Sequence, residues 1–204
     1  MKPRLRGEAY LVRYLDDFVV CFQYRTDAER FQEVLIKRLA RFSLELELSK
    51  TKLLEFGRFE KYWRLKRQKK AQTFSFLGFG FFGLHLPNGT YLAATVVDGK
   101  RRNAFMNRLK ESMRRMRHSN LLEQRNNINI KLRGYFNYFA VPFNSKRLNI
   151  IRFLIIRYWR KLLSSRSQNG KMNWQDFNKV LKSYPIVRPM VRFSNLEFST
   201  LWQS

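Results

Sequence analysis

The chain has 204 residues, of which 45% are hydrophobic, so it is long enough for one ordinary domain or two small ones and too apolar for general disorder. Its formal net charge of +26 exceeds what solubility requires and indicates a polyanionic partner, most simply nucleic acid. One cysteine and two histidines exclude an internal disulfide and a Cys/His zinc cluster. With no signal peptide and no apolar stretch of ~20 residues, we expect a cytoplasmic protein without a membrane partner.

The first segment, Tyr10–Phe22 (YLVRYLDDFVVCF), is β-prone and apolar except for the adjacent acids Asp16 and Asp17. Adjacent like charges resist burial, so the pattern predicts two short strands with the acids at or near the bend between them. The single cysteine in the second of these strands, Cys21, is expected to be a small buried hydrophobe.

A helix is expected next, because Thr26 and Glu29 form a capping-box pattern ahead of apolar residues at helical spacing that continue to Phe42. A strand is then expected over Thr51–Phe56, and an exposed, irregular, basic connection over Phe59–Lys70. Hairpin, helix and strand in this order predict a helix packed on a sheet, which is typical of an α+β layer.

The segment Phe74–Val97 is rich in β-formers and contains Pro87-Asn88-Gly89, which predicts a hairpin turn. Asp98 is a plausible helix N-cap, and we place a domain boundary there, between residues 1–97 and residues 98–204. Asn169-Gly170 marks a break before the last helix. The second region is expected to be helical over residues 99–117, 124–140, 145–164 and 174–183.

The acidic pair is open to two interpretations. In a straight strand Asp16 and Asp17 point to opposite faces, but at a tight bend both carboxylates can reach one cleft and form an oxygen-rich site suited to Mg²⁺. The simpler alternative is a solvated turn, because Asp is common in turns. The doublet alone favours the turn.

Five segments in one order change that balance: Arg13–Phe31, Leu46–Phe59, Thr73–Phe79, Lys131–Ser145 and Trp159–Phe177. Together they resemble bacterial group II intron reverse transcriptase/maturases. The resemblance implies a partial palm over residues 1–97 (β-hairpin, helix, strand, β-hairpin), with a hairpin that supports the primer terminus. It implies a helical thumb or maturase domain over residues 98–204.

By the same resemblance, Asp16 and Asp17 are the catalytic Mg²⁺ ligands of an RNA-directed DNA polymerase, with Asp16 the direct ligand. A Lys-Thr pair after the palm helix and the tip of the second hairpin then contact nucleic acid. Those implied positions are Lys50, Thr51, Phe76, Leu77 and Gly78. The glycine suits a hairpin tip where two backbones come close.

The helical half is the more basic one, since residues 101–204 hold 22 Lys and Arg against 4 acids. Cations interleaved with aromatic and amide side chains offer phosphate contacts together with stacking surfaces for RNA. The alternative for each single aromatic ring is a place in the bundle core, and it is the better interpretation ring by ring. The candidate RNA contacts are Arg114, Arg115, Arg117, Lys131, Arg133, Tyr135, Asn137, Tyr138, Arg160 and Arg166.

Two departures from the family limit what we expect of the isolated chain. Leu15 stands where the family usually has alanine, which bears on nucleotide accommodation. The fingers and the palm strand that supplies a further carboxylate have no counterpart in the sequence, so the Mg²⁺ site is expected to be incomplete without, for instance, a separately encoded N-terminal half. The absent strands would pair with Tyr10–Tyr14 or Phe18–Phe22, leaving exposed sheet edges here.

Three functions follow as hypotheses. The first is a fragment of a group II intron reverse transcriptase/maturase that binds intron RNA and the template–primer duplex and does not polymerise DNA alone. The second is a stand-alone RNA-binding maturase module that assists splicing without catalysis. The third is a basic RNA-binding protein of ribosomal type, which the acidic pair in an apolar setting disfavours.

Overall fold

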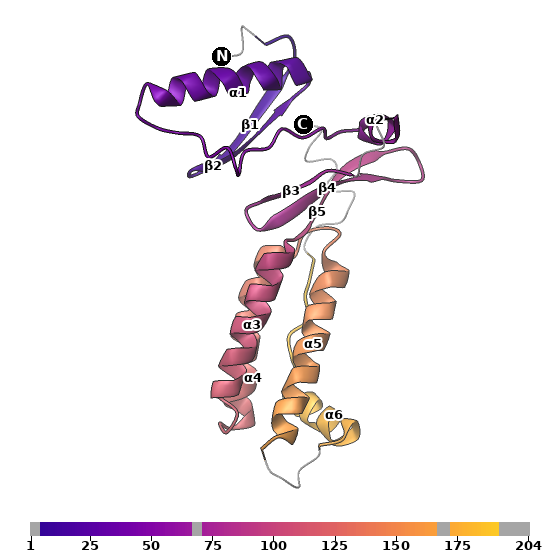
Figure 1. Cartoon of the computed structure of the whole chain (residues 1–204). Helices are drawn as coiled ribbons and strands as arrows, with labels where there is room; N and C mark the ends of the chain where they lie inside the picture. The colour runs from indigo at the N-terminus through magenta and orange to yellow at the C-terminus, as the bar shows by residue number, and fades with distance from the viewer. Residues whose placement is uncertain (1–4, 67–70, 167–171, 192–204) are drawn as a thin grey trace.

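The computed structural model describes residues 5–66, 71–166 and 172–191 (Figure 1). It holds two antiparallel sheets, β1–β2 and β3–β4–β5, and six helices, which confirms the predicted α+β class. In Figure 1 the three-stranded sheet lies between a hairpin-and-helix unit and a bundle formed by the later helices. The chain therefore reads, in order, as a small β-hairpin unit, a central sheet and a helical bundle.

The first unit consists of β1 (Ala9–Tyr14), β2 (Asp17–Phe22) and α1 (Arg25–Ala40). The two strands form the expected antiparallel hairpin, and α1 lies against β2, with the Phe22 and Phe31 ring centroids 5.2 Å apart. Across the part of the chain that the structure describes, no hydrophobic side chain before Ala94 is buried. This unit is therefore an open hairpin covered on one side.

The predicted capping box is wrong. Helix α1 begins at Arg25, and its N-cap Tyr24 makes no side-chain capping bond, so Thr26 lies inside the first turn. The buried Asp27 carboxylate instead accepts hydrogen bonds from the backbone N–H groups of Arg6 (2.9 Å) and Gly7 (3.1 Å). The acid thus fastens the chain that enters β1 onto the helix, a long-range contact that a local sequence pattern does not reveal.

The strand expected over Thr51–Phe56 is also wrong, because no described segment pairs with it. An unpaired strand leaves its backbone groups without partners, and here side chains supply them: Gln72 Oε1 accepts a hydrogen bond from Glu55 N–H (2.7 Å). The basic connection that follows contains a helix, α2 (Glu60–Lys66), and residues 67–70 lie outside the described residues.

The central sheet consists of three strands in the order β3 (Thr73–Phe76), β4 (Phe79–His85) and β5 (Tyr91–Val97), with β4 in the middle. The predicted turn at Pro87-Asn88-Gly89 is confirmed: Leu86 N–H donates to Thr90 O (2.9 Å). Gly89 has φ +81°, a left-handed conformation that glycine adopts without steric cost.

All four helices expected in the second half are present, and Asp98 is the N-cap of the first, as predicted. Asn169-Gly170 lies outside the described residues. Among the helices of the described ranges, none combines the length and the apolarity that crossing a bilayer requires. The four are α3 (Gly99–Arg115), α4 (Leu121–Phe139), α5 (Ser145–Ser164) and α6 (Trp174–Ser183).

The hydrophobic core belongs to the helical half and runs from the end of β5 to the segment after α6. Trp159 of α5 is fully buried, and its indole N–H donates to Gln124 Oε1 of α4 (2.8 Å). Other fully buried members are Leu132, Leu148, Ile155 and Phe177. This bundle is the part of the molecule that buries enough apolar surface to drive folding.

Asn144 joins the central sheet to the bundle. Its side chain is fully buried; Oδ1 accepts a hydrogen bond from Val97 N–H (3.0 Å) at the end of β5, and Nδ2 donates to Phe139 O (3.1 Å) at the end of α4. The amide therefore satisfies the N–H group that β5 leaves open at its end, and it adds a second donor to Phe139 O, which also accepts from Val141 N–H (2.8 Å).

Replacing Asn144 with alanine should leave the Val97 N–H group without a partner in the interior, and we expect the free energy of unfolding to fall by about 1–3 kcal/mol. Urea unfolding followed by circular dichroism measures the change. Asn149→Ala is the matched control, because Asn149 is exposed and bonds only within its own helix. Equal losses for the two variants would contradict the bridging role of Asn144.

Candidate nucleic-acid interface and acidic hairpin tip

The acidic pair lies at the tip of the β1–β2 hairpin. Tyr14 pairs with Asp17, so Leu15 and Asp16 form the two-residue turn, and both acids are exposed. Leu15 has φ +56°, the positive value that the first position of such hairpin turns requires and that a bulky side chain adopts at a steric cost. The prediction that the acids lie at the bend is confirmed.

The turn is held by its own strand, because Arg13 Nε donates to Leu15 O (2.8 Å). Within the residues that the structure describes, no group of three His, Cys, Asp or Glu side chains lies close enough together to hold a metal ion. Mg²⁺ requires several oxygen ligands in near-octahedral geometry, and two adjacent carboxylates on an exposed turn supply part of that set. The described residues therefore supply only part of a Mg²⁺ site.

The strands that flank the acids expose apolar side chains, Tyr10 at 64%, Leu11 at 62% and Tyr14 at 59% of their surface. Cys21 of β2 is exposed as well, so its predicted burial is wrong. The cause is the same for all of them, because a two-stranded sheet with a helix on one side leaves its other face uncovered.

Lys50 and Thr51 lie in a tight turn after α1. Both of their backbone N–H groups donate to Glu47 O (3.1 and 3.0 Å), and the Thr51 hydroxyl donates to the same oxygen (2.9 Å). The Glu47 carboxylate accepts hydrogen bonds from Ser49, which, together with the charge of Lys50, hold its pKa below the ordinary value. The turn leaves the Lys50 side chain exposed and available to an anion.

The tip of the β3–β4 hairpin docks on the bundle. Phe76 pairs with Phe79, so Leu77 (φ +50°) and Gly78 (φ +82°) form a two-residue turn with both residues left-handed, as a type I′ turn requires. The Tyr138 hydroxyl of α4 donates to Leu77 O (2.9 Å). Two predicted nucleic-acid contacts that are 61 residues apart in the chain are therefore brought together.

The first turn of α3 completes this junction. Asp98 N–H donates to Gly78 O (3.0 Å), and the Asp98 carboxylate accepts from Ser75 Oγ (2.7 Å) and from the backbone N–H groups of Lys100 and Arg101. These hydrogen bonds, that of Ser75 above all, hold the pKa of Asp98 below its ordinary value. The Arg101 side chain lies against Gly78, and a cation is thereby placed at the hairpin tip.

The remaining candidates on α4 divide by burial. Arg133, Asn137 and Tyr138 are exposed, whereas Tyr135 is 8% exposed and stacks on Phe105 of α3 with ring centroids 3.9 Å apart. Burial raises the pKa of Tyr135 to about 12, so its hydroxyl is neutral at physiological pH. The ring belongs to the core, the alternative weighed for each aromatic, and its faces are not open to stack on a base.

Cations at the far end of the bundle have internal partners. Arg114 donates to the Tyr158 hydroxyl (2.7 Å), and Arg115 pairs with Glu111, but both side chains remain exposed. Arg160 donates to Met172 O (2.9 Å) and lies over the Trp174 ring, so it holds α6 in place.

Arg117 and Arg166 lie at the turn between α3 and α4. Arg117 contacts His118, its neighbour in the chain, and Arg166 donates to Ser119 O (2.8 Å). Arg166 therefore ties the end of α5 to that turn. Burial lowers the pKa of Arg166, which stays charged because an arginine pKa begins so high.

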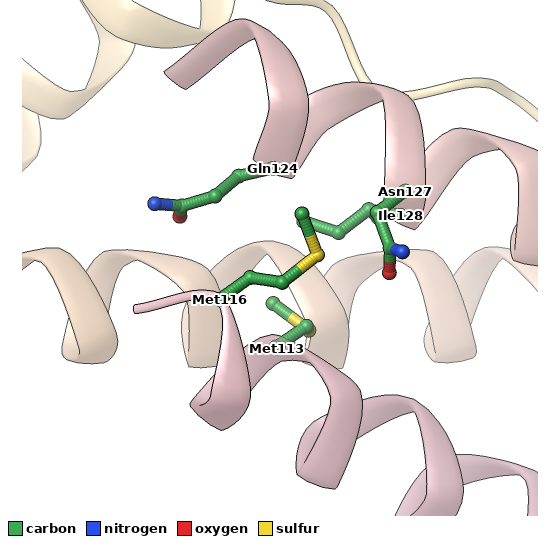
Figure 2. A pocket seen from close by; sticks show the side chains of 5 residues that line it. All are labelled: Met113, Met116, Gln124, Asn127 and Ile128. Carbon is green, nitrogen blue, oxygen red and sulfur yellow. The ribbon is translucent and has the colours of Figure 1, made fainter. Parts of the chain in front are cut away.

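Two spaces lie between α3 and α4. In the first, Met113 of α3 and Met116, which directly follows α3, face Gln124, Asn127 and Ile128 of α4 (Figure 2). They leave no room for a water molecule, so this space is filled by side-chain packing. The second is an open groove of about 410 Å³. The sequence reasoning missed it, although a glycine inside an otherwise helical pattern was a signal that pointed to it. The groove is lined by Phe105, Arg108, Leu109, Lys131, Gly134 and Tyr135.

A scan against protein-family models and a search of the curated proteins both returned no match for this sequence. The resemblance to group II intron proteins therefore depends on the five sequence segments, and the roles it implies remain predictions.

Gly78→Ala should destabilise the protein by about 1–2 kcal/mol, because its φ of +82° forces a Cβ into the left-handed region. The midpoint of urea unfolding, at unchanged slope, measures the loss. Gly99→Ala is the control: Gly99 is the first residue of α3, and a Cβ there meets nothing within 4 Å. A control variant as unstable as Gly78→Ala would contradict this account of the turn.

Proposed function

We propose that this chain is the C-terminal palm and thumb segment of a group II intron reverse transcriptase/maturase and that it binds structured RNA through its helical half. The observation that carries the proposal is the charge of α3. The helix holds seven cations and one acid, Glu111, which pairs with Arg115. A helix with this imbalance repels itself unless a polyanion neutralises it.

The position of the cations supports a nucleic-acid partner. Arg101 lies at the β3–β4 tip, and the exposed Tyr138 hydroxyl binds the same tip, so a cation and an aromatic ring flank one turn of backbone. Cations that contact phosphates and rings that stack on bases are the usual means by which proteins hold RNA. The partners proposed are intron RNA and a template–primer duplex.

For the complete enzyme the proposed reaction is RNA-templated addition of nucleotides to a DNA strand. Mg²⁺, when bound, would supply stabilisation of the attacking and leaving oxygens. The part of this chain is to present Asp16 and Asp17 at an exposed hairpin tip, where they contribute two carboxylates. A further oxygen donor has to come from outside the described residues, and a separately encoded N-terminal half is the proposed source.

A second function is a maturase module that binds intron RNA without catalysis. The distribution of buried side chains favours it, because the core runs from Ala94 to Ile186, whereas the hairpin unit that bears the acids buries no hydrophobic residue in its described part. The basic bundle thus has its own core and does not depend on the acidic hairpin for it.

Binding to RNA through phosphates should weaken steeply with salt. Changing Arg101 and Arg102 to glutamine should reduce the slope of log affinity against log salt by about 1 for each arginine removed. Fluorescence anisotropy with a labelled intron-type hairpin RNA measures it. Arg30→Gln with Arg38→Gln, two exposed cations of α1, is the charge-matched control and should change the slope less. Equal slopes for both pairs would show that net charge, and not the bundle, binds RNA.

Asp16→Asn tests the division of roles. In an enzyme complemented with the fingers and the upstream palm, we expect it to abolish primer extension, because a metal ligand is lost. RNA affinity should stay within about twofold, because an acidic side chain contributes no contact to an RNA phosphate that its loss could remove. Glu33→Gln, on the exposed side of α1, is the matched control and should affect neither. A parallel fall of RNA affinity and extension contradicts separate sites.

A further inference from the structure

Gly134 lies in the middle of α4, where a glycine weakens the helix relative to alanine. Nothing within 4 Å would meet a Cβ at this position, and the residue is exposed. No neighbour in the described part of the chain therefore requires the side chain to be absent. The α4 backbone is therefore open at this position to a molecule from outside.

The groove at Gly134 has the size and lining of a ligand site. Its volume of about 410 Å³ falls in the ~300–1,000 Å³ range of small-molecule pockets. Phe105, backed by the buried Tyr135 ring on which it stacks, forms an aromatic wall. Arg108 and Lys131 are the charged lining residues, with no acid among them. Lys131 Nζ donates to Ser112 Oγ, and an ammonium group has further donors to offer.

We propose that this groove seats one unpaired nucleotide of the bound RNA. The base lies against the half-buried Phe105 and over Gly134, where the missing side chain lets a flat ring reach the helix backbone. The phosphate is held by Arg108 and Lys131. This inference rests on the proposed RNA binding and adds a preference for RNA that displays an extruded base, because a base stacked inside a duplex cannot enter the groove.

An aromatic wall can bind either an apolar side chain of a protein partner or a nucleotide base. The charge of the residues that line the groove distinguishes these two occupants. An apolar side chain from a protein partner would bury itself against Phe105 equally well but would gain nothing from the two cations that line the groove. A nucleotide uses the wall and both cations at once. Charge complementarity therefore favours the nucleotide.

The experiment compares two RNA hairpins that differ by one bulged nucleotide, a 2-aminopurine, in binding to the full chain. Gly134→Leu fills the groove and should weaken binding of the bulged RNA about tenfold, while the unbulged RNA stays within about twofold. The 2-aminopurine fluorescence should be quenched by the native chain and not by the variant. Asn126→Leu, which adds a leucine at another exposed position of α4, should change neither affinity.

A folding defect is separated from a binding defect by thermal unfolding, because leucine is the better helix former and Gly134→Leu should unfold at the same or a higher temperature. Lys131→Gln is the second variant and should reduce the preference for the bulged RNA without filling the groove. Equal weakening for both RNAs, no weakening, or displacement of the bulged RNA by a neutral tryptophan peptide overturns the inference and leaves the proposed function standing. Failure of the native chain to bind either RNA overturns both.

Discussion

A buried amide holds the molecule together where its sheet meets its helices. Asn144 is fully buried and bonds to the end of β5 and to the end of α4 at once. Because β5 pairs with β4, and β4 carries the Leu77–Gly78 tip, the position of that tip over α4 depends on this link. The exposed Tyr138 and the cation Arg101 meet the tip only while β5 and α4 keep this relation.

The helical bundle and the β1–β2 hairpin are stabilised by different interactions. The bundle buries Trp159, Leu132 and Ile155 and gains the hydrophobic stabilisation that folding needs. The β1–β2 hairpin has one helix against it and exposes Tyr10, Leu11 and Leu15. A two-stranded hairpin is marginal in water by itself, so α1 and the Asp27 contacts with the entering chain are what stabilise it.

The cations of the helical half fall into two groups, those with partners inside the protein and those that remain exposed. Few acids lie near the cations of α3, and several arginines instead bond to backbone oxygens or aromatic rings, as Arg160 does with Met172 O and the Trp174 ring. Those arginines are structural. Arg101, Arg108 and Arg133 remain exposed, and they define where a polyanion gains most by approaching the bundle.

The sequence by itself determined the elements whose signals are local. The helix periods after Asp98, the turn at Pro87-Asn88-Gly89 and the bend at Asp16 and Asp17 are all encoded within a few residues, and the structure has them. Tertiary structure decided what depends on a distant partner. The expected strand over Thr51–Phe56 has no strand to pair with, and Asp27 bonds to the entering chain where a capping box was expected.

Tertiary packing also decided which candidate site residues are exposed and which are buried. Periodicity places Tyr135 and Tyr138 on one helix, but only the packing of Phe105 against Tyr135 shows which ring is buried. The groove at Gly134 exists because two helices that are separate in sequence lie side by side at that point. Local pattern thus determined what the elements are, and the long-range contacts of buried polar and aromatic side chains decided which surfaces remain open.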